Sequence, residues 1–211
     1  MHNERKPRIV VTILNGKRQM SREAGAYPER IHRAMDLAAE AHDGQYRKNR
    51  ESRIPYLSHC AMVGQLLLKA GFDEEVAAAG ILHDTLEDTD ISEETLAERF
   101  GDRIAGLVVE VTEKDKSLPW EVRKARYLDG MKAASTEALA ISCADKIHNM
   151  WSLILYQRSG RNAWSIMKKD RETQIERFEK LAGIFRARFD HPLREIFEDA
   201  FAILKRECQD R

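Results

Sequence analysis

The sequence Gly80-Ile81-Leu82-His83-Asp84-Thr85-Leu86-Glu87-Asp88-Thr89 places one histidine and three carboxylates directly after a short apolar run. The preceding residues 74–79 are glutamate, valine and alanine, and they predict that residues 74–88 form one helix. Side chains four positions apart on a helix share a face. We therefore expect two pairs of polar side chains here, the members of each pair being one helical turn apart.

The first members of these pairs are His83 and Asp84, and the second members are Glu87 and Asp88. A metal ion held by the His-Asp dipeptide would have two carboxylates one turn away, where they could meet a bound water or a leaving group. A His-Asp dipeptide alone is weak evidence, because the chain contains another at 42–43. The alternative interpretation is a set of polar residues at the end of a helix.

Two distant residues favour the metal site. His59 lies at the start of another predicted helix, and Asp145 follows the apolar run 138–144. Together with the dipeptide they form a set of two imidazoles and two carboxylates. Such a set suits manganese, iron or zinc better than calcium. We therefore predict a metal centre with four ligands: His59, His83, Asp84 and Asp145.

Helical signals dominate on both sides of this stretch. Pro28 suits a first helical turn, and the apolar residues that follow recur at three- and four-residue spacing. Ser92, followed by two glutamates, is a good N-cap for a further helix. The length fits one domain. The pattern predicts an all-α, single-domain helical bundle over residues 28–211. Its last two helices carry aromatic residues that we expect in the core: Phe178, Phe185, Phe197 and Phe201.

Residues 1–27 differ from the rest. The segment from Ile9 to Leu14 is mostly β-branched and is followed by Asn15-Gly16, which predicts a strand and a turn. One short strand cannot make a sheet. We therefore expect an N-terminal appendage that contains a strand or a hairpin, that is disordered, or that serves as an edge partner in a dimer.

The composition limits the partners. The chain has 35 basic and 35 acidic residues, so no overall charge favours nucleic acid or a membrane surface. No apolar run approaches the roughly 20 residues of a membrane span, and the polar N-terminus is unlike a signal peptide. Cys60 and Cys143 stand in apolar helical contexts, which with a third cysteine indicates reduced thiols. We expect a soluble cytoplasmic protein whose oligomeric state is open.

Four motifs follow one another along the chain. They are Pro55-Tyr56 with His59, the stretch 83–89, Val108 to Thr112, and Ala144-Asp145-Lys146-Ile147-His148-Asn149-Met150. In this order they resemble the HD superfamily and, more narrowly, the hydrolase domain of the Rel/Spo alarmone enzymes and the stand-alone small alarmone hydrolases. The resemblance runs from about residue 30 to about residue 156. It implies an HD-type bundle that uses Mn²⁺ to hydrolyse the 3′-diphosphate of (p)ppGpp.

The resemblance also implies a set of substrate-binding residues. Arg47 and Lys48 match an Arg-Lys pair of the family, in which the arginine stacks on guanine and the lysine meets phosphate. Such stacking and pairing suit these side chains. Asn149, four residues beyond Asp145, would contact the ribose, and Ser152 is a weaker candidate. The alternative for the basic pair is an ordinary solvated loop.

Glu87 and Asp88 are the candidate catalytic residues. Next to a metal they could orient or deprotonate water, or protonate a leaving alkoxide. The sequence offers no Cys-His or Ser-His-Asp arrangement and no glycine-rich P-loop. Phosphate would therefore be met by the metal and by cationic side chains. Further candidates for a phosphate channel, or for a plain surface cluster, are Lys116, Arg123 and Lys124.

The chain departs from the family pattern at two places. Cys60 stands where proline is usual, and residues 49–54 replace a shorter Ser-Gly-Glu-type link. The altered link bears on the substrate more than on catalysis, so two other functions stay open. One is an HD phosphohydrolase for another nucleotide, such as the 2′-phosphate of NADPH or a nucleoside polyphosphate. The other is a nucleotide sensor without catalysis, which would have no need of Glu87 and Asp88.

Overall fold

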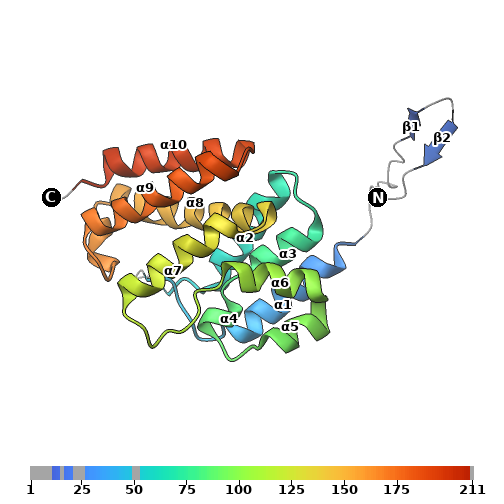
Figure 1. The fold of residues 1–211 in the computed structure, drawn as a ribbon, viewed down its shortest axis with the longest axis horizontal. Helices are drawn as coiled ribbons and strands as arrows, with labels where there is room; N and C mark the ends of the chain where they lie inside the picture. Colours follow the sequence, from blue (N-terminus) through green and yellow to red (C-terminus); the bar gives the residue numbers. More distant parts are fainter. Residues whose placement is uncertain (1–10, 15–16, 21–26, 49–52, 210–211) are drawn as a thin grey trace, which may run out of the picture.

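The computed structural model describes residues 11–14, 17–20, 27–48 and 53–209. Most of these residues are helical, so the all-α prediction is confirmed (Figure 1). The helices are α1 (Glu29–Ala41), α2 (Leu57–Lys69), α3 (Glu74–Leu82), α4 (Thr85–Asp88), α5 (Glu93–Phe100), α6 (Asp102–Val111), α7 (Trp120–Ala133), α8 (Thr136–Arg158), the 3-10 helix η1 (Ala163–Ile166), α9 (Arg171–Arg188) and α10 (Pro192–Glu207).

The N-terminal segment contains a hairpin. Strand β1 (Val11–Leu14) pairs antiparallel with β2 (Lys17–Met20), with Val11 opposite Met20. The predicted strand thus finds a partner within the segment itself. The expected turn at 15–16 lies outside the described residues. The division of the chain into 1–27 and 28–211 stays a prediction.

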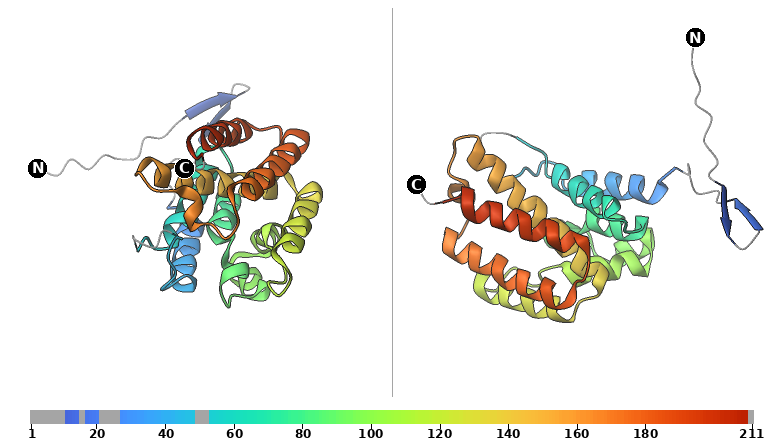
Figure 2. Two further views of the ribbon diagram at one scale, coloured as in Figure 1. Left: turned by 90° about the vertical axis from the view of Figure 1, so that its left-hand side faces the viewer. Right: turned by 90° about the horizontal axis from the view of Figure 1, so that it is seen from above.

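Helix α8 lies at the centre of the bundle. It packs against α2, α3 and α6 and against α9 and α10. Figures 1 and 2 show the first three helices on one side of α8 and the last two on the other. Residues 138–145 of α8 are buried without interruption. A helix segment that is apolar all round is buried on every side, which explains why this run occupies the centre. Asp145, at its end, is thereby carried into the interior.

The two C-terminal helices cover α8 through their aromatic side chains. The ring centroids of Phe185 and Phe197 are 5.1 Å apart and nearly perpendicular, and those of Phe178 and Phe201 are 6.0 Å apart. All four rings are at most 1% exposed. Their predicted place in the core is confirmed.

The prediction of one helix over residues 74–88 is wrong. Helix α3 ends at Leu82, and α4 begins at Thr85. Two side chains form hydrogen bonds with the last backbone carbonyl oxygens of α3. Nδ1 of His83 contacts the carbonyl oxygen of Gly80 at 2.8 Å, and Oγ1 of Thr85 donates to the carbonyl oxygen of Leu82 at 2.7 Å. Carbonyls at a helix end need such partners. The break turns His83 and Asp84 toward each other, whereas neighbours on a regular helix point apart.

Helices α2 and α3 approach each other closely through two glycines. A Cβ atom on Gly64 would lie 2.5 Å from Cγ1 of Ile81, and one on Gly80 would lie 2.3 Å from Cδ1 of Leu67. The Leu67 atom is the end of a flexible side chain, but the Ile81 atom is held nearer the backbone. The close approach brings His59 of α2 toward the end of α3.

We expect Gly64→Ala to destabilise the protein by about 1–3 kcal/mol, because the added methyl group overpacks the α2–α3 contact. Gly183→Ala is the matched control: a Cβ at Gly183 in α9 meets nothing within 4 Å, so this change should stabilise by about 0.5–1 kcal/mol. Urea denaturation measures both free energies of unfolding. Equal stabilisation by the two substitutions would contradict the close approach.

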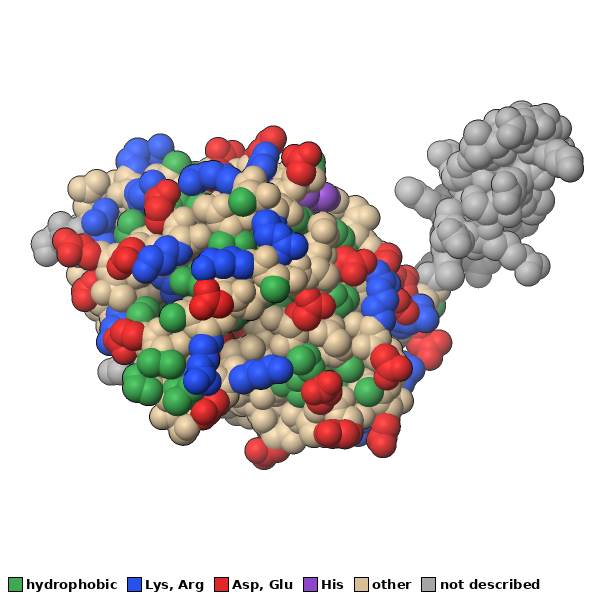
Figure 3. Space-filling view, viewed as in Figure 1, with side chains coloured by type: hydrophobic (Ala, Val, Ile, Leu, Met, Phe, Trp, Pro, Cys, Tyr) green, Lys and Arg blue, Asp and Glu red, His purple; other side chains and the backbone are tan. Residues whose placement is uncertain are grey.

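No described helix combines the length and apolar character needed to cross a membrane. On the face seen in Figure 3, Lys and Arg side chains are interspersed with Asp and Glu. This mixture agrees with the equal numbers of basic and acidic residues in the chain.

Candidate metal centre and active site

Four side chains from three parts of the fold converge on one point. His59 projects from α2, His83 and Asp84 lie between α3 and α4, and Asp145 lies in α8. Nε2 of His59 is 3.2 Å from Nε2 of His83 and 3.2 Å from Oδ1 of Asp145. Oδ2 of Asp84 is 3.0 Å from Nε2 of His83 and 3.6 Å from that of His59. The structure therefore brings all four predicted ligands together.

The spacing of these donor atoms suits a divalent metal ion. Ligands about 2.1 Å from an octahedral ion lie about 3 Å from their nearest neighbours, close to the distances found here. Two imidazoles and two carboxylates are a borderline donor set that suits manganese, iron or zinc. His59, His83 and Asp145 are buried, each at most 6% exposed. The cluster has the chemistry of a site for a divalent metal ion.

The two imidazoles are oriented by their second ring nitrogens. Nδ1 of His83 faces the carbonyl of Gly80, which can only accept, so this nitrogen carries the proton and Nε2 of a neutral ring is left with a lone pair. Nδ1 of His59 lies 2.7 Å from Nδ1 of His148. Outer contacts of this kind fix the tautomer of metal-binding histidines. His148 is thus a partner of the predicted ligand His59.

The electrostatics of the cluster favour positive charge. Burial opposes ionisation of Asp84 and Asp145, but the imidazoles, and Lys146 in the case of Asp145, outweigh it and hold the pKa of both carboxyls well below the usual range. Burial likewise opposes a charge on His83, yet Asp84 raises the pKa of His83 to about 9. A proton and a metal ion compete for such nitrogens, so metal affinity should rise with pH.

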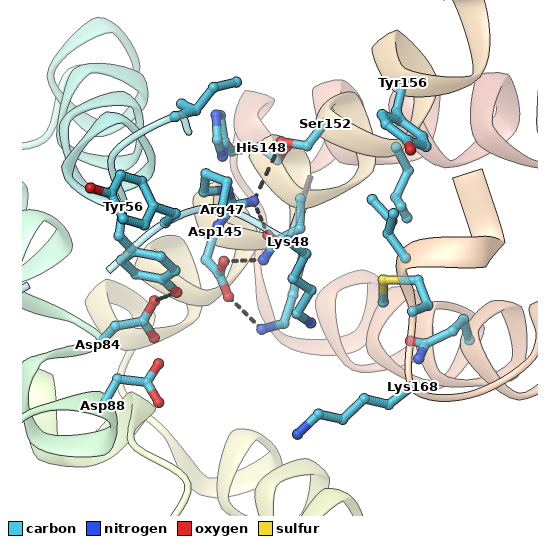
Figure 4. A pocket seen from close by; sticks show the side chains of 18 of the residues that line it. Arg47, Lys48, Tyr56, Asp84, Asp88, Asp145, His148, Ser152, Tyr156 and Lys168 are labelled. Carbon is cyan, nitrogen blue, oxygen red and sulfur yellow. Dashed lines mark hydrogen bonds and ion pairs between the residues drawn. The ribbon is translucent and has the colours of Figure 1, made fainter. Parts of the chain in front are cut away.

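Tyr56 orients one of the carboxylates. Its hydroxyl donates to Oδ2 of Asp84 at 2.5 Å (Figure 4). Burial and the negative charge of Asp84 raise the pKa of Tyr56, so the hydroxyl stays a donor. The sequence motif contained this tyrosine without revealing its partner.

We expect Tyr56→Phe to weaken Mn²⁺ binding by about 10- to 100-fold, since contacts that orient metal ligands typically contribute that much. Isothermal titration of metal-free protein measures the affinity. Tyr127→Phe is the control, because it removes another largely buried hydroxyl, which pairs with Oγ of Ser142 at 2.6 Å. The assigned role fails if both variants bind Mn²⁺ alike.

Three of the four predicted substrate residues contact one another. Nη2 of Arg47 donates to Oδ1 of Asn149 at 2.9 Å and lies 3.4 Å from Oγ of Ser152. Nδ2 of Asn149 donates to Asp145. The guanidinium also lies 5.5 Å from the ring centre of Tyr56. Asn149 therefore connects the metal cluster to the arginine. That these residues contact the substrate stays a prediction.

Glu87 and Asp88 lie beside the cluster and have different surroundings. Burial, followed by the charges of Glu113, Asp84 and Asp88, raises the pKa of Glu87 to about 7. Asp88 instead forms an ion pair with Lys116. Glu87, whose Oε1 lies 3.8 Å from Nη1 of Arg123, can therefore exchange a proton near neutral pH, whereas Asp88 is held by the closer ammonium group of Lys116. Environments that differ in this way are typical of acid–base pairs.

The two carboxylates of the cluster, Glu87, Asp88 and the predicted substrate residues line one cavity of about 1060 Å³, whereas the buried imidazoles of His59 and His83 are not part of its lining. This volume suits a nucleotide-sized ligand. Lys48 lines the cavity, and so do the predicted channel residues Lys116, Arg123 and Lys124. Two of these are held by an acid that sequence reasoning missed: Glu113 lies 3.1 Å from Nη1 of Arg123 and accepts from Nζ of Lys124.

Sequence reasoning also missed residues beyond the motifs. Lys146 pairs with Asp145, and its position next to that ligand was the available signal. Lys168, Gln174 and Arg177 also line the cavity. No spacing rule connects these three to the metal ligands, because they reach the cavity only through the packing of α9. Of the altered link at 49–54, residues 49–52 lie outside the described part of the chain.

Comparison with known proteins places these features in a family. The HD domain family matches residues 34–183. A protein named guanosine-3′,5′-bis(diphosphate) 3′-pyrophosphohydrolase MESH1 from Danio rerio is 34% identical over 163 residues, which cover 72% of this chain and 89% of that protein. Its namesake from Xenopus tropicalis is 36% identical over 137 residues, covering 64% and 74%.

Other relatives are much longer. A guanosine-3′,5′-bis(diphosphate) 3′-pyrophosphohydrolase from Aquifex aeolicus is 36% identical over 64% of this chain, but the match spans only 19% of that protein. A solved structure described as a metazoan ortholog of SpoT that hydrolyzes ppGpp matches with a TM-score of 0.74 and 29% identity, over 88% of this chain and 100% of that one. With its motifs, bundle and ligand cluster in agreement, the chain belongs to the HD domain family.

Proposed function

We propose that this protein hydrolyses (p)ppGpp at the 3′-diphosphate, giving GDP or GTP and pyrophosphate, with Mn²⁺ as its metal. The observation that carries the proposal is the convergence of two imidazoles and two carboxylates beside Glu87, in a cavity that is otherwise rich in cationic side chains. The names of the two MESH1 relatives and of the solved neighbour support the choice of substrate.

In the proposed reaction a water oxygen bonds to the phosphorus that carries the 3′-oxygen, and the bond between that phosphorus and the 3′-oxygen breaks. A divalent ion at the cluster would lower the pKa of a coordinated water and offset charge on the phosphoryl oxygens. Glu87, with its pKa of about 7, takes the proton of the attacking water and returns one to the leaving 3′-oxygen. Asp88, held by Lys116, orients the water.

Arg47, Lys48 and Asn149 bind different parts of the nucleotide in this proposal. Arg47, fixed by Asn149 and Ser152, offers the flat face of its guanidinium to the guanine. Lys48 meets phosphate, and Asn149 reaches the ribose. These assignments carry the family pattern onto the matching residues of this chain.

The test is turnover with identified products. Purified protein stripped with EDTA and reloaded with Mn²⁺, Mg²⁺, Zn²⁺ or Ca²⁺ is incubated with ppGpp, and the products are separated by ion-exchange chromatography. We expect GDP and pyrophosphate in equal amounts, fastest with Mn²⁺. Release of phosphate alone, or no turnover with any ion, would refute the proposal. NADPH and nucleoside polyphosphates in the same assay test the alternative that another nucleotide is preferred, and calorimetry tests binding without hydrolysis.

A further inference from the structure

The side of the cavity opposite Tyr56 and Asp84, called here its far end, is lined by residues that follow α8 in the sequence, and Lys48 of the loop before α2 is near enough for their charges to act on it. Lys168 precedes α9, and Gln174 and Arg177 lie on its first turns, whereas Lys48 comes from the loop. Figure 4 shows Lys168 entering on the side opposite Tyr56 and Asp84, with its ammonium group directed across the cavity. None of these residues belongs to the metal cluster or to Glu87 and Asp88.

We propose that Lys48, Lys168 and Arg177 form a second phosphate site, which binds the 5′-diphosphate of the nucleotide while the 3′-diphosphate lies at the metal cluster. This inference rests on the proposed function and deepens it. It names the part of the substrate that the far end of the cavity recognises, and Arg177 as the residue that selects for it.

The first support is the number of polar groups left without partners there. Among the described residues, Lys48, Lys168 and Arg177 have neither an ion pair nor a hydrogen bond, and Nε of Arg177 is buried. Oε1 of Gln174, which is 2% exposed, also lacks a partner in this part of the chain. Buried donors and acceptors are normally satisfied. A ligand that carries both acceptor and donor groups would satisfy Arg177 and Gln174 together.

The second support is the contrast with the other cations of the cavity. Lys116, Lys124 and Lys146 each have a carboxylate partner, as does Arg123. The far end has cations without a carboxylate that neutralises them. Arg47 is held by the neutral side chains of Asn149 and Ser152. In the described part of the chain, the cavity cations that lack both a carboxylate and a hydrogen bond are Lys48, Lys168 and Arg177.

The third support is mutual repulsion. Although the Lys48 side chain is exposed, burial of its surroundings and the nearby Arg177, Arg47 and Lys168 lower the pKa of its ammonium group. Burial and Arg177 likewise lower the pKa of Lys124 to about 8, even with Glu113 beside it. Like charges held close together cost free energy that a bound polyanion recovers. A diphosphate has the charge and the oxygens to do so.

The test compares two substrates and two variants. Arg177→Gln removes the central cation, and Lys180→Gln removes the same charge from the exposed face of α9. On ppGpp we expect Arg177→Gln to lower kcat/KM by about 10- to 100-fold, mainly through KM, while Lys180→Gln retains wild-type kinetics. On guanosine 3′-diphosphate, which lacks the 5′-phosphates, the loss caused by Arg177→Gln should be several-fold smaller. An equal loss on both substrates, or no loss on ppGpp, would overturn the second site.

A binding measurement keeps this result separate from the fate of the proposed reaction. Inorganic pyrophosphate is titrated into metal-free protein, in which the metal cluster holds no ion to attract it. We expect about 10-fold weaker binding to Arg177→Gln than to Lys180→Gln. Equal affinities would reject the second site even if ppGpp is hydrolysed. A difference would support it even if ppGpp is not the substrate. Circular dichroism and the Tm of each variant verify that the fold is retained.

Discussion

Asp84→Asn and Asp145→Asn are both expected to lower kcat/KM for ppGpp by more than about 100-fold. Removing a side chain that only contacts a metal ligand typically lowers metal affinity or activity by about 10- to 100-fold. These two substitutions remove the negative charge of the predicted ligand itself, so a larger loss is expected. Oδ2 of Asp84 and Oδ1 of Asp145 each lie within 3.0–3.2 Å of an imidazole nitrogen of the cluster. Metal content by mass spectrometry and kcat/KM should therefore fall together in both variants.

The two variants should differ in stability. Lys146 is largely buried, with 11% of its side chain exposed, and pairs with Asp145, so Asp145→Asn leaves an ammonium group without its carboxylate. Breaking a buried pair on one side is strongly destabilising, by about 3–5 kcal/mol. Asp84 is more exposed, and its partners can adapt: the Tyr56 hydroxyl can still donate to an asparagine oxygen, and His83 can lose its proton once the carboxylate is gone. Urea denaturation of metal-free protein separates the two effects. Full metal content and activity in either variant would remove that residue from the ligand set.

Glu87→Gln should reduce kcat by about 10²- to 10⁴-fold, the usual contribution of a positioned acid or base, while the metal stays bound. Wild-type kcat/KM should rise as the pH passes through about 7, because the carboxylate form of Glu87 is the base. Glu113→Gln removes the strongest neighbouring negative charge and should move this rise to lower pH. An unshifted profile in Glu113→Gln, with Glu87→Gln fully active, would assign the chemistry to another group.

The same carboxyl makes stability depend on pH. Its pKa is about 7 in the folded chain and 4.5 as a free group, so the folded state holds a proton that the unfolded state has lost between these values. The stability that this proton contributes is present below about pH 4.5 and is lost as the pH rises through 7. Metal-free Glu87→Gln should therefore exceed the wild type in stability at pH 8, by up to about 3 kcal/mol, and by less at pH 5. A difference that does not change with pH would contradict the raised pKa.

The four residues that converge in the cluster could be found from the sequence because each has a local signal. A His-Asp dipeptide after an apolar run, a histidine at a helix start and an aspartate at the end of a buried segment are readable one by one. The predicted helix over 74–88 was wrong because periodicity does not reveal that the side chains of His83 and Thr85 form hydrogen bonds with the last backbone carbonyl oxygens of α3. That local competition for hydrogen bonds is what turns the dipeptide toward His59.

The sequence by itself determined the all-α bundle, and it singled out the four side chains that converge in the cluster and the two acids beside them, since helical periodicity and residue chemistry are properties of short segments. Only the tertiary structure decided that Tyr56 holds Asp84, that Glu113 raises the pKa of Glu87, and that Arg177 shares a cavity with Lys48. These residues are far apart in the chain. Burial and charge act through space, so contacts of this kind exist only after the helices have packed.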